Sequence, residues 1–105
     1  MSDTLTRLEA AIAQRRHASP EESYVAKLHA KGLNKIAQKL GEEATEAVIA
    51  ALAGDEPELV GEAADLLFHL MVLLGARGVT LQQVLAELDR REGTSGLAEK
   101  AARSE

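Results

Sequence analysis

Two groups of carboxylates near the middle of the chain have the residue types and spacing for metal chemistry: Glu42-Glu43-x-x-Glu46 and Glu62-x-x-Asp65. Each group lies in a segment that otherwise reads as an apolar helix. Positions 41 to 76 hold eight carboxylates and neither lysine nor arginine. A carboxylate on a core-bound helix cannot stay charged without a partner. Since the sequence offers no nearby cation, the pattern predicts a bound metal ion.

The spacing within each group places two carboxylates on one helix face. Residues three or four apart are neighbours on a helix surface, so Glu43 aligns with Glu46, and Glu62 aligns with Asp65. Antiparallel packing of the two helices would bring both pairs together as four oxygen donors. Such a donor set suits a hard cation, Mg²⁺ or Mn²⁺.

Glu42 lies about 100° around the helix from Glu43, and three roles are open to it. It holds a metal-binding carboxylate in place without binding the ion itself, it binds another metal ion, or it orients water. A simpler interpretation treats Glu42, Glu43 and Glu46 as a solvated helix face. That interpretation fails for Glu62 and Asp65, because their helix has little other polar surface.

Two lysines precede the first acidic group on a similar helix face. Lys35 and Lys39 bind phosphate oxygens, or they pair with Glu42 and Glu43 at helical spacing. We favour phosphate binding, because a metal held by four carboxylates keeps a net negative charge. An anionic substrate then needs separate cations.

His69 and Tyr24 are the other polar candidates. His69 extends the stripe of Glu62 and Asp65 by one turn. It orients a carboxylate, contacts substrate, or lies in the core hydrogen-bonded to the backbone, and the core role is the usual one. Tyr24 stacks on a base or packs in the core, and core packing is favoured.

Composition bounds the class of protein. The chain has 105 residues, of which 46% are hydrophobic and 2% aromatic, as expected for one small domain of closely packed helices. A core of this size favours oligomerisation. The net charge of -5 argues against nucleic acid as the main partner. The absence of cysteine excludes disulfides and thiolate metal sites.

The sequence predicts a soluble, cytoplasmic protein. The N-terminus has no uncharged apolar signal region. The longest apolar run, residues 66–75, is interrupted by His69 and is too short to span a bilayer. We therefore expect no membrane partner.

Apolar periodicity and the helix start and stop residues predict five helices. We expect a helix from Thr4 to Arg16, one capped by Ser19 and ending near Lys31, one capped by Asn34 and ended by Gly54, one at Glu56–Ala76 and one at Leu81–Glu92. The fourth is apolar nearly all round and should be central. The result is an all-α, small antiparallel helical bundle in a single domain, residues 1–105. Residues 93–105 form a mobile C-terminal tail.

A carboxylate-held Mg²⁺ beside lysines suits hydrolysis of a phosphate anhydride, through polarised phosphate oxygens and a neutralised pyrophosphate leaving group. A remaining carboxylate takes the proton of the attacking water. The sequence has no glycine-rich phosphate loop and no Ser/His/Asp arrangement. The residues therefore predict a metal-dependent helical hydrolase of an anionic substrate, without identifying that substrate.

The two acidic groups resemble the pattern of the all-α, MazG-type nucleoside triphosphate pyrophosphatases. Neighbouring segments narrow the resemblance to the phosphoribosyl-ATP pyrophosphatases of histidine biosynthesis. These segments are residues 23–28, 31–36, 38–43, 65–70 and 95–100. The resemblance covers about residues 4 to 103, nearly the whole chain.

The resemblance implies hydrolysis of phosphoribosyl-ATP to phosphoribosyl-AMP and pyrophosphate, with Mg²⁺, in a cytoplasmic homodimer. By position it implies five catalytic acids, four of them metal ligands: Glu43, Glu46, Glu62 and Asp65 as ligands, and Glu42 as the additional acid. It implies a set of substrate-binding residues that comprises Lys35, Lys39, Tyr24, His69 and Lys100.

Two features of the sequence qualify the resemblance. Phe68 stands where many relatives have Tyr, so a hydroxyl contact is missing there. The chain has no cysteine and no second domain, so the phosphoribosyl-AMP cyclohydrolase that acts next would be a separate protein. The tail, with Lys100 and Arg103, would be a mobile segment that contacts phosphate.

Two alternative functions are open at this point. A housekeeping pyrophosphatase of the same superfamily, acting on nucleoside or deoxynucleoside triphosphates, would use the same carboxylates with different base and sugar contacts. A noncatalytic helical dimerisation module would leave the acids solvated or paired with cations of a partner chain. Only the second alternative predicts no stabilisation by Mg²⁺.

Overall fold

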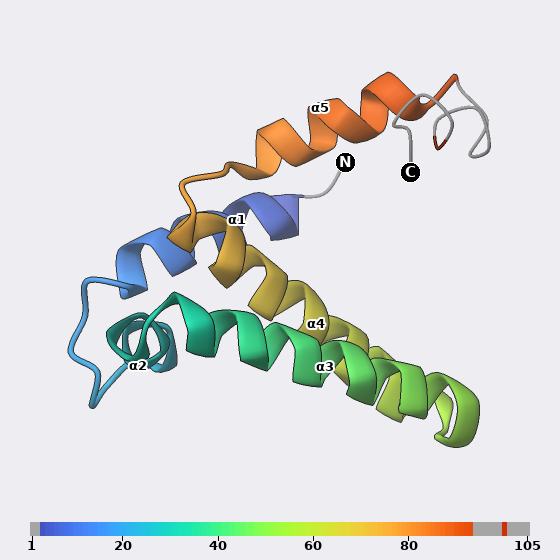
Figure 1. The fold of residues 1–105 in the computed structure, drawn as a ribbon, viewed down its shortest axis with the longest axis horizontal. Helices are drawn as coiled ribbons and strands as arrows, with labels where there is room; N and C mark the ends of the chain where they lie inside the picture. Colours follow the sequence, from blue (N-terminus) through green and yellow to red (C-terminus); the bar gives the residue numbers. More distant parts are fainter. Residues whose placement is uncertain (1–2, 94–99, 101–105) are drawn as a thin grey trace.

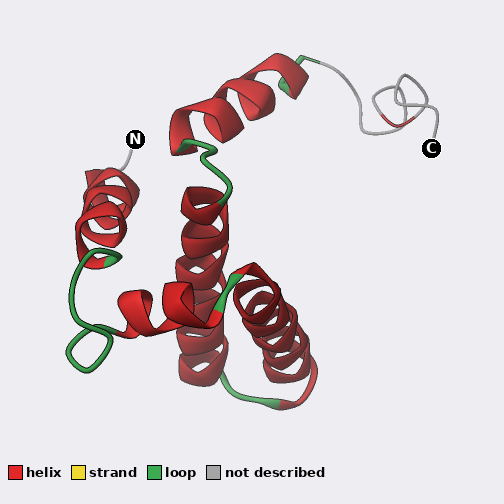
Figure 2. Cartoon of the chain, turned by 60° about the vertical axis from the view of Figure 1, so that its left-hand side comes forward, coloured by secondary structure: helices red, strands yellow, loops and turns green. Residues whose placement is uncertain are grey.

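The computed structural model describes residues 3–93 and Lys100, and every regular element in residues 3–93 is helical (Figures 1 and 2). The five helices are α1 (Asp3–Arg15), α2 (Tyr24–Lys31), α3 (Leu33–Ala53), α4 (Glu56–Ala76) and α5 (Leu81–Arg91). The prediction of five helices is confirmed. The predicted mobile tail lies outside the described residues, apart from Gly93 and Lys100.

Helices α3 and α4 run side by side as a long antiparallel hairpin, and the other helices gather at one end of it (Figures 1 and 2). Helix α2 packs on α3, while α1 packs on α4. The core lies where these four helices and the start of α5 meet, and its buried side chains are Ile12, Val25, Leu28, Ile36, Met71, Val72 and Leu81. Helix α5 projects away from the hairpin, with contacts chiefly to α1.

A tight turn joins α3 to α4. Asp55 caps α4: its Oδ1 accepts from the Glu58 N–H, and the Asp55 N–H donates to Glu58 Oε1, both at 2.9 Å. A side chain at Gly54 would crowd this cap, because a Cβ there would lie 2.9 Å from Glu58 Oε1 and 3.0 Å from the Ala50 carbonyl oxygen. The predicted start of α4 at Asp55 and Glu56 is confirmed.

The predicted start of the second helix at Ser19 and Pro20 is wrong. Residues 20–22 form a turn, and α2 begins at Tyr24 with Ser23 as its cap. Ser19 is held locally, since its hydroxyl bonds to the Glu21 carboxylate. Ser23 Oγ instead accepts from the Ala26 N–H at 3.1 Å and donates to the Arg15 carbonyl at 3.2 Å. The cap contact to the end of α1 is a tertiary contact that the local sequence does not encode.

The predicted cap at Asn34 is also wrong. Helix α3 begins earlier, at Leu33, and Gly32 serves as the end of α2 and the start of α3 at once. The φ of Gly32 is 100°, which glycine adopts readily and other residues rarely do. The predictions differ by one residue at both ends of α1, which spans Asp3–Arg15, and at the end of α5, which is Arg91. The bounds of α4, the start of α5 and the ends of α2 and α3 are as predicted.

Helix α4 contacts both α1 and α3, as its central position predicts, yet only 17% of its most apolar 18-residue window is buried. Large apolar side chains remain exposed along the hairpin and form what we call the distal face, with Leu52 84% exposed. The distal face comprises Val48, Ile49, Leu52, Leu59, Val60 and Leu67. Nothing in the described part of this protomer covers it.

By length and composition alone, α4 is long and apolar enough to cross a membrane, with a mean hydropathy of 1.7. The sequence analysis considered only the apolar run of residues 66–75, whereas the whole helix is longer than that run. Glu62 and Asp65 lie in the middle of the helix. Charged carboxylates at the centre of a bilayer are costly.

Candidate functional site

Pairing of α3 with α4 brings three predicted ligands together. A carboxylate oxygen from each of Glu43, Glu62 and Asp65 lies within 4.8 Å of the other two. Glu43 comes from α3 and is only 8% exposed, whereas Glu62 and Asp65 come from neighbouring turns of α4. The site therefore exists only when the hairpin is formed. We call these residues the carboxylate triad.

Two oxygens of the carboxylate triad are buried without compensation. Glu43 Oε1 and Glu62 Oε1 have no hydrogen-bond partner among the described residues. Burial raises the pKa of Glu62, and hydrogen bonding to Glu46 and the negative charges of Glu46, Asp65 and Glu43 raise it further. Asp65 is exposed, so the triad spans from a buried to an accessible carboxylate. Clustered, mutually repelling carboxylate oxygens fit a hard divalent cation.

Glu46, the fourth predicted ligand, is exposed on α3 and lies beside Glu62 rather than within the carboxylate triad. It lines an open groove of about 270 Å³ that continues past Glu62 toward Glu58 and Gly54. Its role as a ligand stays a prediction.

Glu42 is turned to its own helix. It accepts a hydrogen bond from Gln38 Nε2 at 2.8 Å and lies 3.3 Å from Lys39 Nζ. These two contacts, Gln38 first, lower its pKa, and it is therefore ionised at neutral pH. Lys39 Nζ also lies 3.9 Å from Glu43 Oε2. Lys39 thus makes the helical ion pairs that were the alternative to phosphate binding.

The hydrogen bond to Glu42 is the largest cause of the raised pKa of Lys39. Lys35 is partly buried one turn earlier, and its charge also lowers the pKa of Glu42. The two lysines therefore stand beside the acidic site at the edge of α3.

His69 links the acidic site to α2. It is 6% exposed, and its Nδ1 lies 2.7 Å from the Asp65 carbonyl oxygen. Because a carbonyl can only accept, Nδ1 carries the proton, and Nε2 then accepts from the Tyr24 hydroxyl at 2.8 Å. His69 is thus a buried histidine bonded to backbone, the usual core role, and it also fixes a tyrosine beside the carboxylates.

The prediction that favoured core packing for Tyr24 is wrong. The residue opens α2 at the surface and is 45% exposed. Its ring stacks on Phe68 with centroids 6.1 Å apart and planes 25° apart. Partial burial and the charges of Glu43 and Asp65 raise its pKa, while Lys39 acts in the opposite sense. Tyr24 is therefore close to the acidic site and accessible to a ligand.

Sequence reasoning missed the cavity beside this tyrosine. It measures about 430 Å³ and is lined by Arg15, Ala18, Glu22, Ser23, Tyr24, Val25 and Phe68. The α1–α2 loop brings Arg15 there, and no spacing in the sequence signals that contact. Lys100 is exposed, and the remaining residues of the predicted phosphate-contacting tail lie outside the described residues.

Comparison with known proteins adds independent findings. Residues 5–92 match the family described as Phosphoribosyl-ATP pyrophosphohydrolase. A phosphoribosyl-ATP pyrophosphatase of Erythrobacter litoralis is 71% identical over 103 residues, 98% of this chain and 99% of that protein. The enzyme of the same name from Novosphingobium aromaticivorans is 72% identical over 102 residues, 97% of this chain and 95% of that protein.

A third relative with that name, from Rhizorhabdus wittichii, is 71% identical over 103 residues. The predicted resemblance is thereby confirmed along nearly the full length of both sequences. The chain belongs to the phosphoribosyl-ATP pyrophosphohydrolase family.

Proposed function

We propose that this protein hydrolyses phosphoribosyl-ATP to phosphoribosyl-AMP and pyrophosphate, as a cytoplasmic enzyme of histidine biosynthesis. The observation that carries the proposal is the carboxylate triad, with two buried oxygens that lack a partner among the described residues. Relatives about 71% identical that bear this enzyme's name support the choice of substrate.

The carboxylate triad is the proposed holder of Mg²⁺, with Mn²⁺ as a substitute and Glu46 as the fourth ligand. The donor set fits, since all of these atoms are hard carboxylate oxygens and two are buried and uncompensated. When bound, Mg²⁺ polarises phosphate oxygens and offsets the charge of the leaving pyrophosphate.

The chain's own residues bind and orient the reactants. Lys35 and Lys39 bind phosphate oxygens of the triphosphate, and Lys39 exchanges its pairing with Glu42 and Glu43 for the substrate. Glu42 is kept ionised by Gln38 and Lys39. A carboxylate with a lowered pKa is a weak base and a good hydrogen-bond acceptor, which suits Glu42 for orienting the attacking water.

The active form is a homodimer in this proposal, with one domain per chain. The distal face supports the dimer. Only 17% of the most apolar stretch of α4 is buried by the described part of the protomer, and an exposed apolar surface of this kind favours contact with a partner. Leu85 and Leu88 on the projecting α5 are exposed as well. A second copy of the same chain is the commonest kind of partner for such a surface.

Leu52→Glu tests the dimer. A charge at the most exposed position of the distal face should convert a particle of two chains into one of a single chain, measured by sedimentation equilibrium. Gln14→Glu adds the same charge on the exposed side of α1 and should leave the mass unchanged. A wild-type protein with the mass of one chain would refute the dimer.

Pyrophosphate release tests the reaction. Phosphoribosyl-ATP should be cleaved in the presence of Mg²⁺ and not in excess chelator, and ordinary nucleoside triphosphates should be poor substrates. Release from nucleoside triphosphates alone would reassign the enzyme to housekeeping hydrolysis. No release from any of them would leave a noncatalytic helical module.

A further inference from the structure

The cavity of about 430 Å³ beside Tyr24 has no role in the mechanism above. It lies between the end of α1, the start of α2 and Phe68 of α4. Its size is that of a ligand-binding pocket, which in proteins ranges over about 300–1,000 Å³. The cavity is therefore large enough for a sugar phosphate.

The cavity and the carboxylate triad share Tyr24 as a wall. The Tyr24 hydroxyl donates to His69, whose other nitrogen donates to the Asp65 carbonyl oxygen. Phe68 contacts both rings, with centroids 6.1 Å from Tyr24 and 5.2 Å from His69. Tyr24 therefore belongs both to the wall of the cavity and to a hydrogen-bonded chain that ends at Asp65 of the carboxylate triad.

Arg15 is the one cationic residue among the described residues that line this cavity. Its backbone is fixed, because its carbonyl oxygen accepts from Ser23 Oγ at 3.2 Å across the α1–α2 loop. Its side chain is exposed. The position of Arg15 is thus set by the same serine that caps α2, the helix that presents Tyr24.

Phosphoribosyl-ATP carries two separate anionic ends. The triphosphate meets the carboxylate triad, its ion and the two lysines, whereas the added ribosyl group carries a second phosphate that needs its own cation. Guanidinium is the side chain best matched to a phosphate, through paired N–H donors. The flat faces of Tyr24 and Phe68 suit the base that joins the two ends.

We infer that Arg15 binds the phosphate of the phosphoribosyl group inside this cavity, and that this contact lets the enzyme distinguish phosphoribosyl-ATP from ATP. The inference rests on the proposed function, which supplies both the substrate and the position of its triphosphate at the carboxylate triad. Glu22 lines the same cavity, and its negative charge opposes the phosphate. It therefore makes Arg15 more important for binding.

Binding of the reaction product tests the inference without metal or turnover. In excess chelator, isothermal titration of the wild-type enzyme should show tighter binding of phosphoribosyl-AMP than of AMP. Arg15→Gln should weaken phosphoribosyl-AMP binding by about tenfold or more, as expected for loss of a charge-assisted hydrogen bond, and should leave AMP binding unchanged. Arg15→Lys should fall between, because it keeps the charge and loses the paired donors.

Two matched variants separate a local contact from a general charge effect. Arg7→Gln removes the same charge from the same helix, about 12 Å away along its axis, and should leave both affinities unchanged. Glu22→Gln should tighten phosphoribosyl-AMP binding by a few-fold, the opposite sign. Equal melting temperatures would show that the variants fold.

Turnover gives a second readout. Arg15→Gln should raise KM for phosphoribosyl-ATP about tenfold, with kcat within twofold of wild type. An Arg15→Gln enzyme that binds phosphoribosyl-AMP as tightly as wild type would overturn the inference, as would a wild type that binds AMP equally well. A wild type that fails to cleave phosphoribosyl-ATP would instead refute the proposed function.

Discussion

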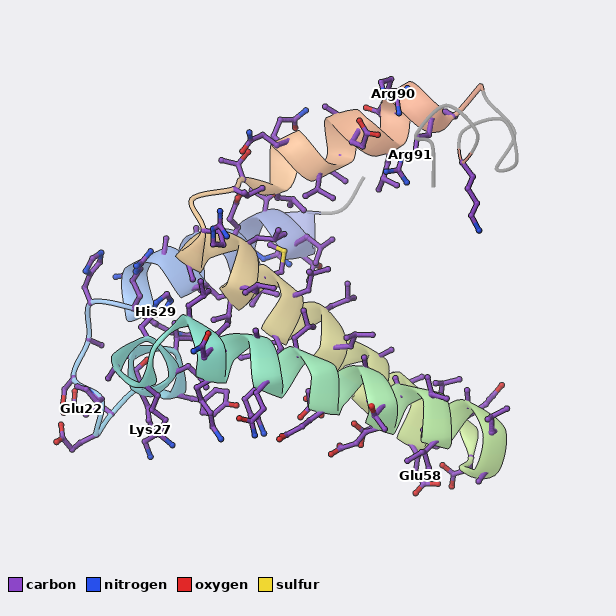
Figure 3. All side chains as sticks on the ribbon, viewed as in Figure 1. Glu22, Lys27, His29, Glu58, Arg90 and Arg91 are labelled. Atoms are coloured by element: carbon purple, nitrogen blue, oxygen red, sulfur yellow. The ribbon has the colours of Figure 1, made fainter. Side chains whose placement is uncertain are left out.

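Two acidic sites on neighbouring helices show how differently the same side chain behaves. On α5, Glu87 accepts hydrogen bonds from Arg90 at 3.1 and 2.8 Å and from Arg91 at 2.9 Å. These arginines, both on the outer helix in Figure 3, lower the pKa of Glu87 to about 2. In residues 3–93 the nearest cation to the carboxylate triad is Lys39, 3.9 Å from Glu43 Oε2, and the pKa of Glu62 is raised.

The difference lies in the placement of cations and not in the number of acids. A carboxylate that is paired within its own helix at the surface contributes little beyond local stability. A carboxylate held against other carboxylates stores unfavourable energy that an ion can relieve. Lys39 lies between these cases, because it pairs with Glu42 and reaches only one edge of the triad.

The largest effect expected from this contrast is on catalysis. Asp65→Asn or Glu62→Gln should reduce Mg²⁺-dependent pyrophosphate release by about a thousandfold or more, because each removes a ligand charge from the ion that stabilises the transition state. Glu87→Gln should keep activity within twofold. Intact activity in both variants would show that the carboxylate triad is not the catalytic metal site.

The next effect is on stability with and without metal. Mg²⁺ at a hundred times its Kd should stabilise the wild type by about 2.7 kcal/mol, a rise of several degrees in Tm. Glu62→Gln should lose most of this rise. A differential scan with Mg²⁺ and with chelator measures both. An unchanged Mg²⁺ response in Glu62→Gln would show that the ion binds elsewhere.

Without metal, Glu62→Gln should be more stable than wild type at neutral pH. The folded pKa of Glu62 is raised, so its ionisation opposes folding above that pKa, and this penalty is absent below the unfolded value of 4.5. The advantage of the variant should therefore fade as the pH falls through the raised folded pKa and be gone below about 4.5. An advantage of the same size at acidic pH would contradict charge repulsion as the cause.

Lys39→Gln tests the intermediate case. It should raise KM for phosphoribosyl-ATP about tenfold through loss of a phosphate contact, while Mg²⁺ binds at least as tightly because a positive charge has left. Lys27→Gln is the matched control, since Lys27 of α2 points away from the hairpin in Figure 3. Equal KM values for the two variants would show that Lys39 pairs with Glu42 and does not contact the substrate.

The smallest effect concerns Glu87. Its folded pKa of about 2 lies below the unfolded value of 4.5, so its pairing stabilises the fold above pH 4.5 and is lost as the pH falls toward 2. Glu87→Gln should lower Tm slightly at pH 7 and not at all near pH 2. Thermal denaturation at several pH values measures the difference. A gap that persists at pH 2 would show that the arginines stabilise by contact rather than charge.

The sequence predicted the hairpin and three members of the acidic site, because helical periodicity is local and an antiparallel connection leaves few registers for Glu43 to meet Glu62. It did not predict the start of α2. Ser19 and Ser23 are both good caps, and only the contact of Ser23 with Arg15 favours the second.

Tyr24 and His69 lie 45 residues apart, and nothing in their spacing signals the 2.8 Å contact between them. The same holds for Arg15, the last residue of α1, which lines the Tyr24 cavity because the loop that follows it folds α2 back against the end of α1. Tertiary contacts across loops are the part of the site that sequence periodicity cannot supply.

The turn at Gly54 has a consequence for protein engineering. A side chain at Gly54 would force Glu58 or the Ala50 carbonyl to shift. We therefore expect this tight turn to set how α3 lies along α4, and hence where Glu43 stands opposite Glu62 and Asp65. Transplanting the two acidic motifs onto another pair of helices would therefore fail unless the glycine and its cap were moved as well. Residues that contact neither the ion nor the substrate therefore help to set the geometry of the site.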